Sequence, residues 1–518
     1  MIFIQSASGV AKTDGRFKVC TYLCTKKQAK VMKRTICMIV AFAAWGSMAG
    51  AEADTLVLGL QDAIRLAQSQ SPSVQSARNT FLAAYWSYRS YQANYLPSVT
   101  LSSAPYINRQ MNKITQSDGT AMFIQQDQFG ADLSLCVNQN ISWTGGSLFL
   151  KSSLSRIDEF QKNTTAYSSR PLVVGYEQNL FGYNSLKWDR RIEPIRYREA
   201  KKQYAETLEV ISATTCNYFF SLAAAQTELE MARQNFASAD TLYSMAQGRY
   251  RIGTITENEM LQLEINRLNE ETNVMDAEIN LKEVEQGVRS FLGLDQTVGL
   301  RLVMPDSVPQ FEVPLASALE LALQNNPDPE YYRRIVKESE SYLSNAKASN
   351  GLRADLYVQF GLSQTGRDIS SSYNHLMHQE YASVSLSLPI LDWGRGRGKV
   401  RVAKSQLALT QTQAEQGMND FSQNVEKLVL QFNMQARRVH IAALTDKRAE
   451  QRHAVARRLY VLGRSSILDL NTAVSEKNAA RRGRISTLRT YWSLYYTLRS
   501  MTAYDFEHNT PLAEQLPI

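Results

Sequence analysis

Cysteine and histidine are scarce in this sequence, with five of each in 518 residues. Three of the cysteines fall within the first 53 residues, and the remaining two, Cys136 and Cys216, are too few for a disulfide framework. His375 and His378 have a ligand-like spacing but lack a third ligand nearby. The sequence therefore predicts neither a disulfide-stabilised domain nor a metal site.

Long apolar runs are also missing, apart from one near the start of the chain. Residues 36–45 are apolar, follow the basic segment Met32-Lys33-Arg34 and precede small residues at 49–53. This pattern is typical of a secretory signal peptide and is too short to span a bilayer. We predict a signal peptide over 32–53 and interpret 1–31 as a spurious extension ahead of the true start.

A basic excess gives the chain a net charge of +8 and a pI near 9.0. Residues 1–53 hold eight basic and two acidic residues, so six of the eight excess charges leave with this segment. The exported chain carries only +2. The composition therefore gives no support for nucleic-acid binding, which needs a basic surface that stays on the mature protein.

The chain contains one pattern twice. At an offset of 255, identical or similar residues follow Leu60, Ala63, Ile64, Leu66, Ala67 and Pro72. At an offset of 210, Asn179-Leu180-Phe181 aligns with Pro389-Ile390-Leu391, and Tyr250, Gly253 and Glu259 align with Tyr460, Gly463 and Asp469. The difference of 45 residues places an insertion in the first copy. We predict repeats over 54–295 and 315–505, a linker over 296–314 and a tail over 506–518.

Each repeat combines helical and extended patterns. Apolar residues at every second position predict strands at about 98–181 and 354–391. Apolar residues at alternating steps of three and four predict helices at about 60–95, 188–291, 315–350 and 398–503. A helix from about 190 to 250 would extend roughly 90 Å and pack by coiled-coil contacts. The expected fold class is α+β, mainly α.

Exported strands without a transmembrane helix indicate an outer-membrane β-barrel, since lipid admits only helices or closed sheets. The insertion adds a strand pair around Thr144-Gly145-Gly146, so one protomer offers about four strands, or six with the insertion. Neither number closes a barrel alone, because barrels begin near eight strands. Several protomers would share one barrel; the alternative is a soluble helical protein with a small sheet.

Three motifs resemble those of the TolC-like outer-membrane efflux proteins: Ala-Asn-Tyr-Leu-Pro97, Ser-Leu-Ser-Leu-Pro-Ile-Leu-Asp-Trp-Gly394, and Tyr-x-x-Gly-x5-Asp/Glu in both copies. The resemblance covers nearly all of 54–505. It implies a homotrimer in the outer membrane, with four strands per protomer in a shared barrel that continues into an α-helical coiled-coil tunnel in the periplasm. It also implies a periplasmic adaptor (membrane fusion) protein and an inner-membrane RND or ABC-type pump as partners.

The same resemblance implies a periplasmic gate in the second copy. The family pattern has a tyrosine, an arginine two residues after the glycine, and two aspartates three residues apart. Tyr460 and Asp469 match this pattern, whereas Ser465 takes the arginine position, with Arg464 one residue early, and Thr472 takes the second acidic position. A ring of three Asp469 side chains would favour cations.

Both long helices end in the same way, at Gly253 and Gly463. A capping-box spacing follows each glycine, so Asp469 also fits a purely structural role at the start of the next helix. We predict these two turns as the tips that dock the adaptor. Tyr250 and Glu259, the first-copy counterparts of Tyr460 and Asp469, are added to the candidate gate.

Tryptophan and basic residues coincide where strands give way to helices. Trp188 lies among basic residues in the first copy, and Trp393 precedes Arg395, Arg397 and Lys399 in the second. They predict a girdle in contact with outer-membrane lipid; the alternative is a solvated helix start. Trp at 393 and Val at 400 exclude a phosphate-binding loop here.

We find no spacing typical of a catalytic set or a nucleotide site, and so predict neither an enzyme nor a cofactor. The function predicted is that of a trimeric outer-membrane exit duct for drugs or other small molecules. One alternative is the exit channel of a type I protein secretion system. Another is a periplasmic coiled-coil structural protein or adhesin without a pore.

Overall fold

The computed structural model describes residues 55–117, 119–305 and 307–512. The predicted extension (1–31) and signal peptide (32–53), and the last six residues of the predicted tail, lie outside these ranges. Within the described ranges, one compact unit of residues 57–296 and 300–512 holds the features discussed below, and residues 55–56 and 297–299 fall outside it. None of the helices in the described ranges combines the length and apolar character needed to cross a membrane.

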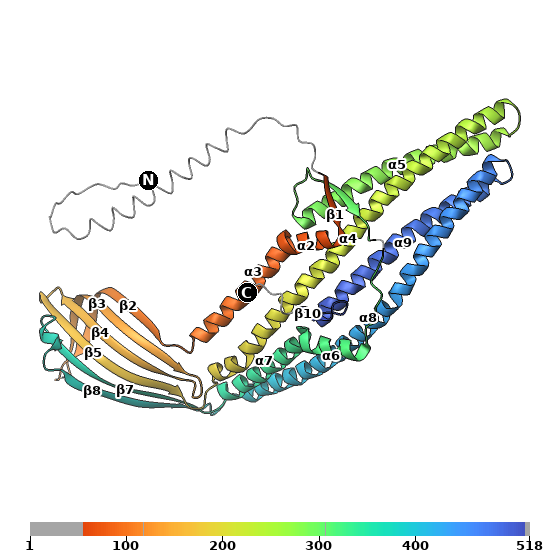
Figure 1. Cartoon of the computed structure of the whole chain (residues 1–518). Helices are drawn as coiled ribbons and strands as arrows, with labels where there is room; N and C mark the ends of the chain where they lie inside the picture. Colours follow the sequence, from red (N-terminus) through yellow and green to blue (C-terminus); the bar gives the residue numbers. More distant parts are fainter. Residues whose placement is uncertain (1–54, 118, 306, 513–518) are drawn as a thin grey trace, which may run out of the picture. The chain divides into compact units, whose positions relative to one another are not determined.

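The helices form two matched sets (Figure 1). The first set is α2 (Leu60–Gln70), α3 (Pro72–Ala93), α4 (Ser185–Arg251) and α5 (Glu257–Leu292); the second is α6 (Leu315–Asn325), α7 (Asp328–Ser349), α8 (Arg395–Val461) and α9 (Ile467–Thr502). Counterparts have equal lengths of 11, 22, 67 and 36 residues. At 1.5 Å per residue, α4 and α8 would each extend about 100 Å.

The two halves share one antiparallel sheet of six strands, in the order β2-β3-β4-β5-β7-β8. The strands are β2 (Ser98–Thr115), β3 (Ala121–Ile141), β4 (Gly146–Glu159), β5 (Thr164–Asn179), β7 (Arg353–Gly366) and β8 (Met377–Ser387). The protomer's sheet thus has the larger of the two strand numbers that the sequence left open. The helix and sheet contents together give a mostly helical chain with some sheet.

The inserted residues of the first copy form the hairpin β3–β4. The strand pairs on either side correspond by the repeat offsets: β2 begins at Ser98 and β7 at Arg353, 255 residues later. In Figure 1 the hairpin lies within the sheet, between β2 and β5. Short strands complete the chain: β1 (Thr55–Gly59), β6 (Gly299–Val303), and the pair β9 (Tyr504–Asp505) and β10 (Thr510–Pro511).

The largest hydrophobic cluster forms where α2, α4, α6, α8 and α9 meet. Its fully buried members include Phe220 of α4, Phe432 of α8 and Tyr491 of α9. Each such side chain contributes roughly 1.5–3 kcal/mol by leaving water. Cys216 is also enclosed there, and burial raises the pKa of its thiol, so the residue acts as a small apolar side chain.

The apolar stripe along α8 faces its neighbours, and two polar residues within it, Gln435 and Asp446, are buried as well. Gln435 donates from Nε2 to the carbonyl oxygen of Thr487 at 3.1 Å. Asp446 is only 4% exposed and lies 3.4 Å from Arg481 and 3.2 Å from Arg484, both on α9. These polar contacts set the position of α8 along α9. Apolar packing alone would set it less specifically.

A buried ionic cluster ties the end of α9 to α4 and to the following hairpin. Arg499 donates from Nε to Glu209 of α4 at 2.9 Å and from Nη1 to Asp505 of β9 at 2.8 Å. Burial opposes ionisation of Asp505, but Arg499 and His508 together hold the pKa of its carboxyl below the usual value. One guanidinium therefore neutralises two buried carboxylates from different parts of the chain.

Replacing that guanidinium should be costly. Arg499→Ala leaves Glu209 and Asp505 buried without their cation, so the free energy of unfolding should fall by about 3–5 kcal/mol. The matched control is Arg65→Ala, which removes an ion pair to Asp62 with side chains 77% and 57% exposed; its effect should stay below about 1 kcal/mol. Urea titrations of the detergent-solubilised protein measure both, and equal losses would contradict the role given to Arg499.

Candidate functional site at the helix tips

The tips of the two long helical hairpins close with the same backbone geometry. Gly253 and Gly463 adopt φ values of +73° and +68°. Thr254 donates its backbone N–H to the carbonyl oxygen of Arg249, and Arg464 donates to that of Leu459, each at 2.9 Å. Such a left-handed residue with a long backward hydrogen bond is a common helix ending that favours glycine.

A capping box begins each returning helix, as the sequence predicted. At α5, Glu259 N–H donates to Thr256 Oγ1 at 3.3 Å, and Thr256 N–H donates to Glu259 at 3.2 Å. At α9, Asp469 N–H donates to Ser466 Oγ at 3.2 Å, and Ser466 N–H donates back to Asp469 Oδ2 at 3.3 Å. Each box satisfies backbone N–H groups that the first helical turn leaves without partners.

Asp469 is held by its own turn within the protomer. Its Oδ2 also accepts hydrogen bonds from the hydroxyls of Ser466 at 2.8 Å and Ser465 at 3.1 Å. These bonds, those from Ser466 first, lower the pKa of the exposed Asp469 carboxyl. Ser465, which takes the arginine position of the family pattern, therefore contributes by orienting an ionised Asp469.

Tyr460 lies at the contact between the two tips. It packs at the edge of an apolar cluster built on Leu242, Ala246, Leu263 and Leu470, which come from both hairpins. Burial raises the pKa of Tyr460, with Arg249 and Glu259 as opposing charges nearby. The structure thus places Tyr460 of the second half beside residues of the first half, Leu242, Ala246 and Leu263.

Arg249 is a residue of this contact that the sequence analysis did not single out. Its Nη2 donates to the carbonyl oxygen of Val461 at 3.0 Å, joining the last turn of α4 to the last turn of α8. The flanking pattern Arg-Tyr-Arg-Ile-Gly253 was the available signal, but a bond to a backbone atom 212 residues away leaves no mark in sequence spacing.

The other predicted gate residues stay on the surface of the protomer. Tyr250 is 40% exposed, and Arg464 is exposed beside the Gly463 turn. The Thr472 hydroxyl donates to the carbonyl oxygen of Leu468 at 2.8 Å, a bond within its own helix. The chain therefore brings Tyr460 and Arg249 into the contact between the tips, and leaves Tyr250, Glu259, Arg464 and Thr472 exposed.

A basic groove of about 1270 Å³ lies between the two hairpins, just before their tips. Its basic lining residues outnumber the acidic pair Glu270 and Glu450; they are Arg457, Arg458, Lys477 and Arg482, and His453 lies among them. Burial and nearby positive charge lower the pKa values of both His453 and Lys477. The groove is suited to polar contacts with an acidic surface.

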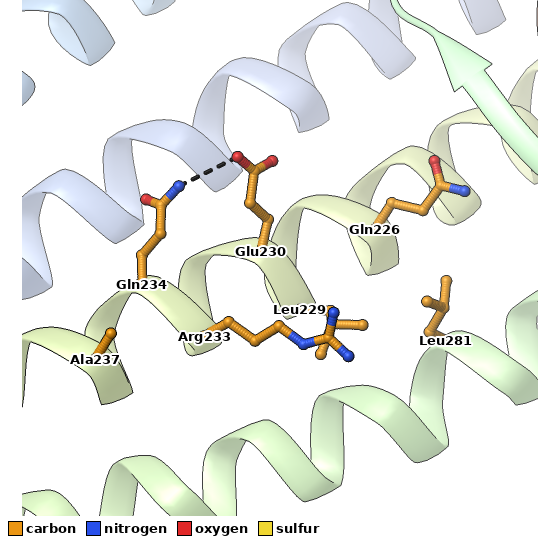
Figure 2. Close-up of a pocket in the computed structure, with 7 residues that line it drawn as sticks. All are labelled: Gln226, Leu229, Glu230, Arg233, Gln234, Ala237 and Leu281. Atoms are coloured by element: carbon orange, nitrogen blue, oxygen red, sulfur yellow. Dashed lines mark hydrogen bonds between the residues drawn. The ribbon is translucent and has the colours of Figure 1, made fainter. Parts of the chain in front are cut away.

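A smaller depression of about 500 Å³ lies against α4 and α5. Figure 2 shows Leu229, Arg233 and Leu281 pointing into the gap between these helices. The two charged groups of its lining are engaged: Glu230 accepts from Gln234 at 3.1 Å, and Arg233 donates to Glu278 at 2.7 Å. This lining is that of a packed helix pair rather than of a reaction site.

The predicted girdle residues lie where the sheet meets the long helices. Arg191 stacks over the ring of Trp188 at 5.3 Å, and Trp393 is 90% exposed. Arg395, Arg397 and Lys399 are exposed in the first turns of α8, where the helix dipole disfavours positive charge. Asp392 offsets this by accepting from the Gly394 and Gly396 N–H groups, which lower the pKa of its carboxyl.

Comparison with known proteins adds a family and a fold. The sequence profile described as "Outer membrane efflux protein" matches residues 63–294 and 318–501. The outer membrane protein MdtQ of Escherichia coli K12, whose name refers to multidrug resistance, is 23% identical over 243 residues, 46% of this chain and 49% of MdtQ. The alkaline protease secretion protein AprF of Pseudomonas aeruginosa is 22% identical over 322 residues, 60% of this chain and 65% of AprF.

The chain thus spans about half of MdtQ and 65% of AprF. Among solved structures, the CmeC outer membrane channel of Campylobacter jejuni is similar with a TM-score of 0.62 and 13% identity, over 86% of this chain and 85% of CmeC. The outer membrane protein VceC of Vibrio cholerae has a TM-score of 0.60 and 13% identity, over 86% and 95%. These likenesses show the fold.

The tip geometry predicts opposite effects for two glycine substitutions. Gly463→Ala places a side chain at φ +68° and should lower stability by about 1 kcal/mol. Gly483→Ala, inside α9 with open space around the site, should raise it by roughly 0.5–1 kcal/mol. Thermal unfolding by circular dichroism, with limited proteolysis at the tips, measures both; shifts of the same sign would contradict this account.

Proposed function

Because the chain belongs to the outer membrane efflux protein family, an assignment that also places it in the outer membrane, we propose that it forms the exit duct of an export system. The family and fold are those of channel proteins. Three protomers share one barrel made from their sheets, and the long helices of α4, α5, α8 and α9 form the wall of a periplasmic tunnel. The observation that carries this proposal is the open sheet, with an apolar face and two unpaired edges in the described protomer.

The edges support assembly for a physical reason. An open sheet in lipid leaves backbone N–H and C=O groups without hydrogen-bond partners, each costing several kcal/mol. Water is absent there, so only another strand can satisfy them. A homotrimer supplies that strand at every edge, which explains how a protomer with too few strands forms a barrel.

The proposed binding site for partner proteins is the end of the long helices that lies away from the sheet. The turns at Gly253 and Gly463 present the exposed ends of both hairpins, and the basic groove beside them offers a surface complementary to an acidic helix. A periplasmic adaptor docks there and connects the duct to an inner-membrane pump of RND or ABC type. The cargo is drugs or other small molecules, as the name of MdtQ supports.

A second candidate cargo is protein. AprF is named as an alkaline protease secretion protein, and it shares 60% of this chain in its alignment. The same duct would then be the exit channel of a type I secretion system. Both cargoes need the pore, so the inner-membrane partner decides between them.

The gate is the contact between the hairpin tips. Tyr460 and Arg249 close the tip of one hairpin against the other, with the charge of Glu259 nearby, and Asp469 contributes a ring of three ionised carboxylates around the entrance. Tyr250, Arg464 and Thr472 face outward from the protomer, toward neighbouring protomers or the adaptor. Opening requires the bond between Arg249 and the Val461 carbonyl to break.

The girdle anchors the barrel at the periplasmic leaflet. Trp188 and Trp393 take the interfacial positions that tryptophan favours, and Arg395, Arg397 and Lys399 reach lipid phosphates. Cations in the first turns of α8 are unfavourable for the helix itself. Their presence there is better explained by an external anion than by helix stability.

Two measurements test the proposed function. Purified protein in planar bilayers should give steady single-channel currents, and absence of a pore would favour a coiled-coil structural protein or adhesin instead. Deletion of the gene should then increase drug susceptibility without changing secreted protein. Loss of a secreted protein with unchanged drug susceptibility would favour the secretion channel.

The gate assignment has its own variants. Asp469→Ala and Asp469→Asn should both lower cation selectivity and alter single-channel conductance, because both remove the charge, whereas Asn keeps an oxygen for the capping box. If Asp469 only caps α9, neither variant changes the selectivity. Arg249→Ala removes a bond worth about 1 kcal/mol, so the open state should gain about fivefold, with Arg251→Ala as the control.

A further inference from the structure

We propose that the inserted hairpin β3–β4 is part of the membrane wall, so that three copies of the chain close an eighteen-stranded barrel in which β8 of one protomer pairs with β2 of the next. This inference rests on the proposed trimeric duct. It departs from the four strands per protomer that the family resemblance implies. Its consequence is an outer mouth wider than a barrel of twelve strands.

The first argument is an apolar belt that crosses the inserted hairpin without a break. Residues directly opposite each other on neighbouring strands share one face of a sheet. One such row, from β2 to β7, consists of Val99, Val137, Leu150, Val174 and Phe360. Leu101 and Leu135 extend the belt on β2 and β3, and Val384 and Leu386 continue it on β8.

The apolar belt is exposed on the inserted hairpin β3–β4, as it is on the other strands of the sheet. Leu135 and Leu150 are 45% and 41% exposed, and Leu101 and Phe360 are 69% and 56% exposed. A contiguous exposed patch of this kind is unusual in water and indicates contact with another apolar phase. A hairpin lying outside the membrane would expose this apolar surface to water, which is unfavourable.

The height of the belt fits a bilayer. On β2 it runs from Val99 to Ile107, roughly 26 Å at 3.3 Å per residue, close to the apolar band of about 25 Å found on outer-membrane barrels. Beyond Ile107 the same face carries the ion pair of Arg109 with Asp127 at 2.8 Å. On β2 and β3, charged residues therefore begin where the lipid would end.

The opposite face of the sheet is polar from β2 to β8. Ser102 and Ser134 share a hydrogen bond of 2.7 Å across β2 and β3. Lys151 of β4 lines a hollow of about 360 Å³ together with polar residues of later strands, among them Arg170, Gln359 and Gln379. Alternation of an apolar outer face with a polar inner face is the pattern of a water-filled barrel.

The two edges are complementary for a ring of three. Six antiparallel strands leave β2 and β8 running in opposite directions, so β8 meets the β2 of a neighbouring copy antiparallel. A threefold ring requires such head-to-tail contacts. The edges also differ in charge, since β2 carries Arg109 and Lys113 and β8 carries Glu380.

Strand number sets the width of the mouth. Barrel diameter grows roughly in proportion to the number of strands, so eighteen strands give about one and a half times the diameter of twelve. Barrels of 16–18 strands leave an aqueous channel. The sheet then sets no size limit on drug-sized solutes, and selection by size falls to the helix tips.

Thiol accessibility tests the position of the hairpin. In a Cys136→Ser background, single variants place cysteine on the polar face (Ser134→Cys, Ser153→Cys) or the apolar face (Leu135→Cys, Leu150→Cys). A charged, water-soluble maleimide should label the polar-face variants of the protein in lipid vesicles at least tenfold faster. Equal labelling of both faces would place the hairpin in water and overturn the inference.

A control separates this failure from failure of the duct itself. Leu101→Cys and Phe360→Cys lie in the belt on β2 and β7, outside the insertion. If they stay protected while the hairpin labels on both faces, the duct stands with twelve strands. If Leu101→Cys and Phe360→Cys label as fast as the polar-face variants, the sheet is not in the membrane, and the proposed function fails as well.

The ring closure has a separate test. The double variant Thr100→Cys with Ser383→Cys places thiols on the polar faces of β2 and β8, for a short bis-maleimide in the same background. Covalent dimers and trimers on a denaturing gel, absent from either single variant, are the expected result. Their absence from a preparation that still forms pores would overturn the pairing of β8 with β2.

Discussion

Hydrogen bonding at the two edges of the sheet is the constraint on which the rest of the structure depends. β2 has β3 as its one partner and β8 has β7, within the strands that the structure describes. The hydrocarbon of a bilayer has no hydrogen-bond partners for the free backbone groups of these edges, so a single protomer would leave them unpaired in a membrane. The even number of strands, the apolar belt and the opposite charges of the edges are all consistent with completion by identical copies. Oligomerisation is then a condition of insertion rather than a later refinement.

The helices obey a different constraint, which is equality of length. Each pair of counterparts matches residue for residue in length, whereas the strand regions differ by a whole hairpin. The bond from Arg249 to the Val461 carbonyl explains why this matters, because the last turns of α4 and α8 must reach the same point to form it. An added turn in one helix would displace its tip by about 5.4 Å and break the contact. The one insertion lies in the sheet, where no contact between the two halves depends on equal lengths.

Sequence patterns predicted what is determined locally. The glycine turns and capping boxes were visible because each depends on residues three to six positions apart, and the repeat offsets located the insertion. The strand number stayed open because alternation reveals that a strand exists but not which strand lies beside it. Arg249 was missed since its partner is a backbone atom far away in the chain. Gln435 and Asp446 are polar positions in an apolar stripe, and only their contacts with α9 reveal why they are buried there.

The antiparallel order of the strands limits how such a pore can change its size during evolution. A protomer that gained one strand would present edges running in the same direction, and the head-to-tail ring would lose its antiparallel seam. The smallest acceptable gain is one hairpin, such as β3–β4. In the proposed ring of three protomers, that single genetic event adds six wall strands at once. Pore diameter in this architecture can thus change only in discrete steps of one hairpin per protomer.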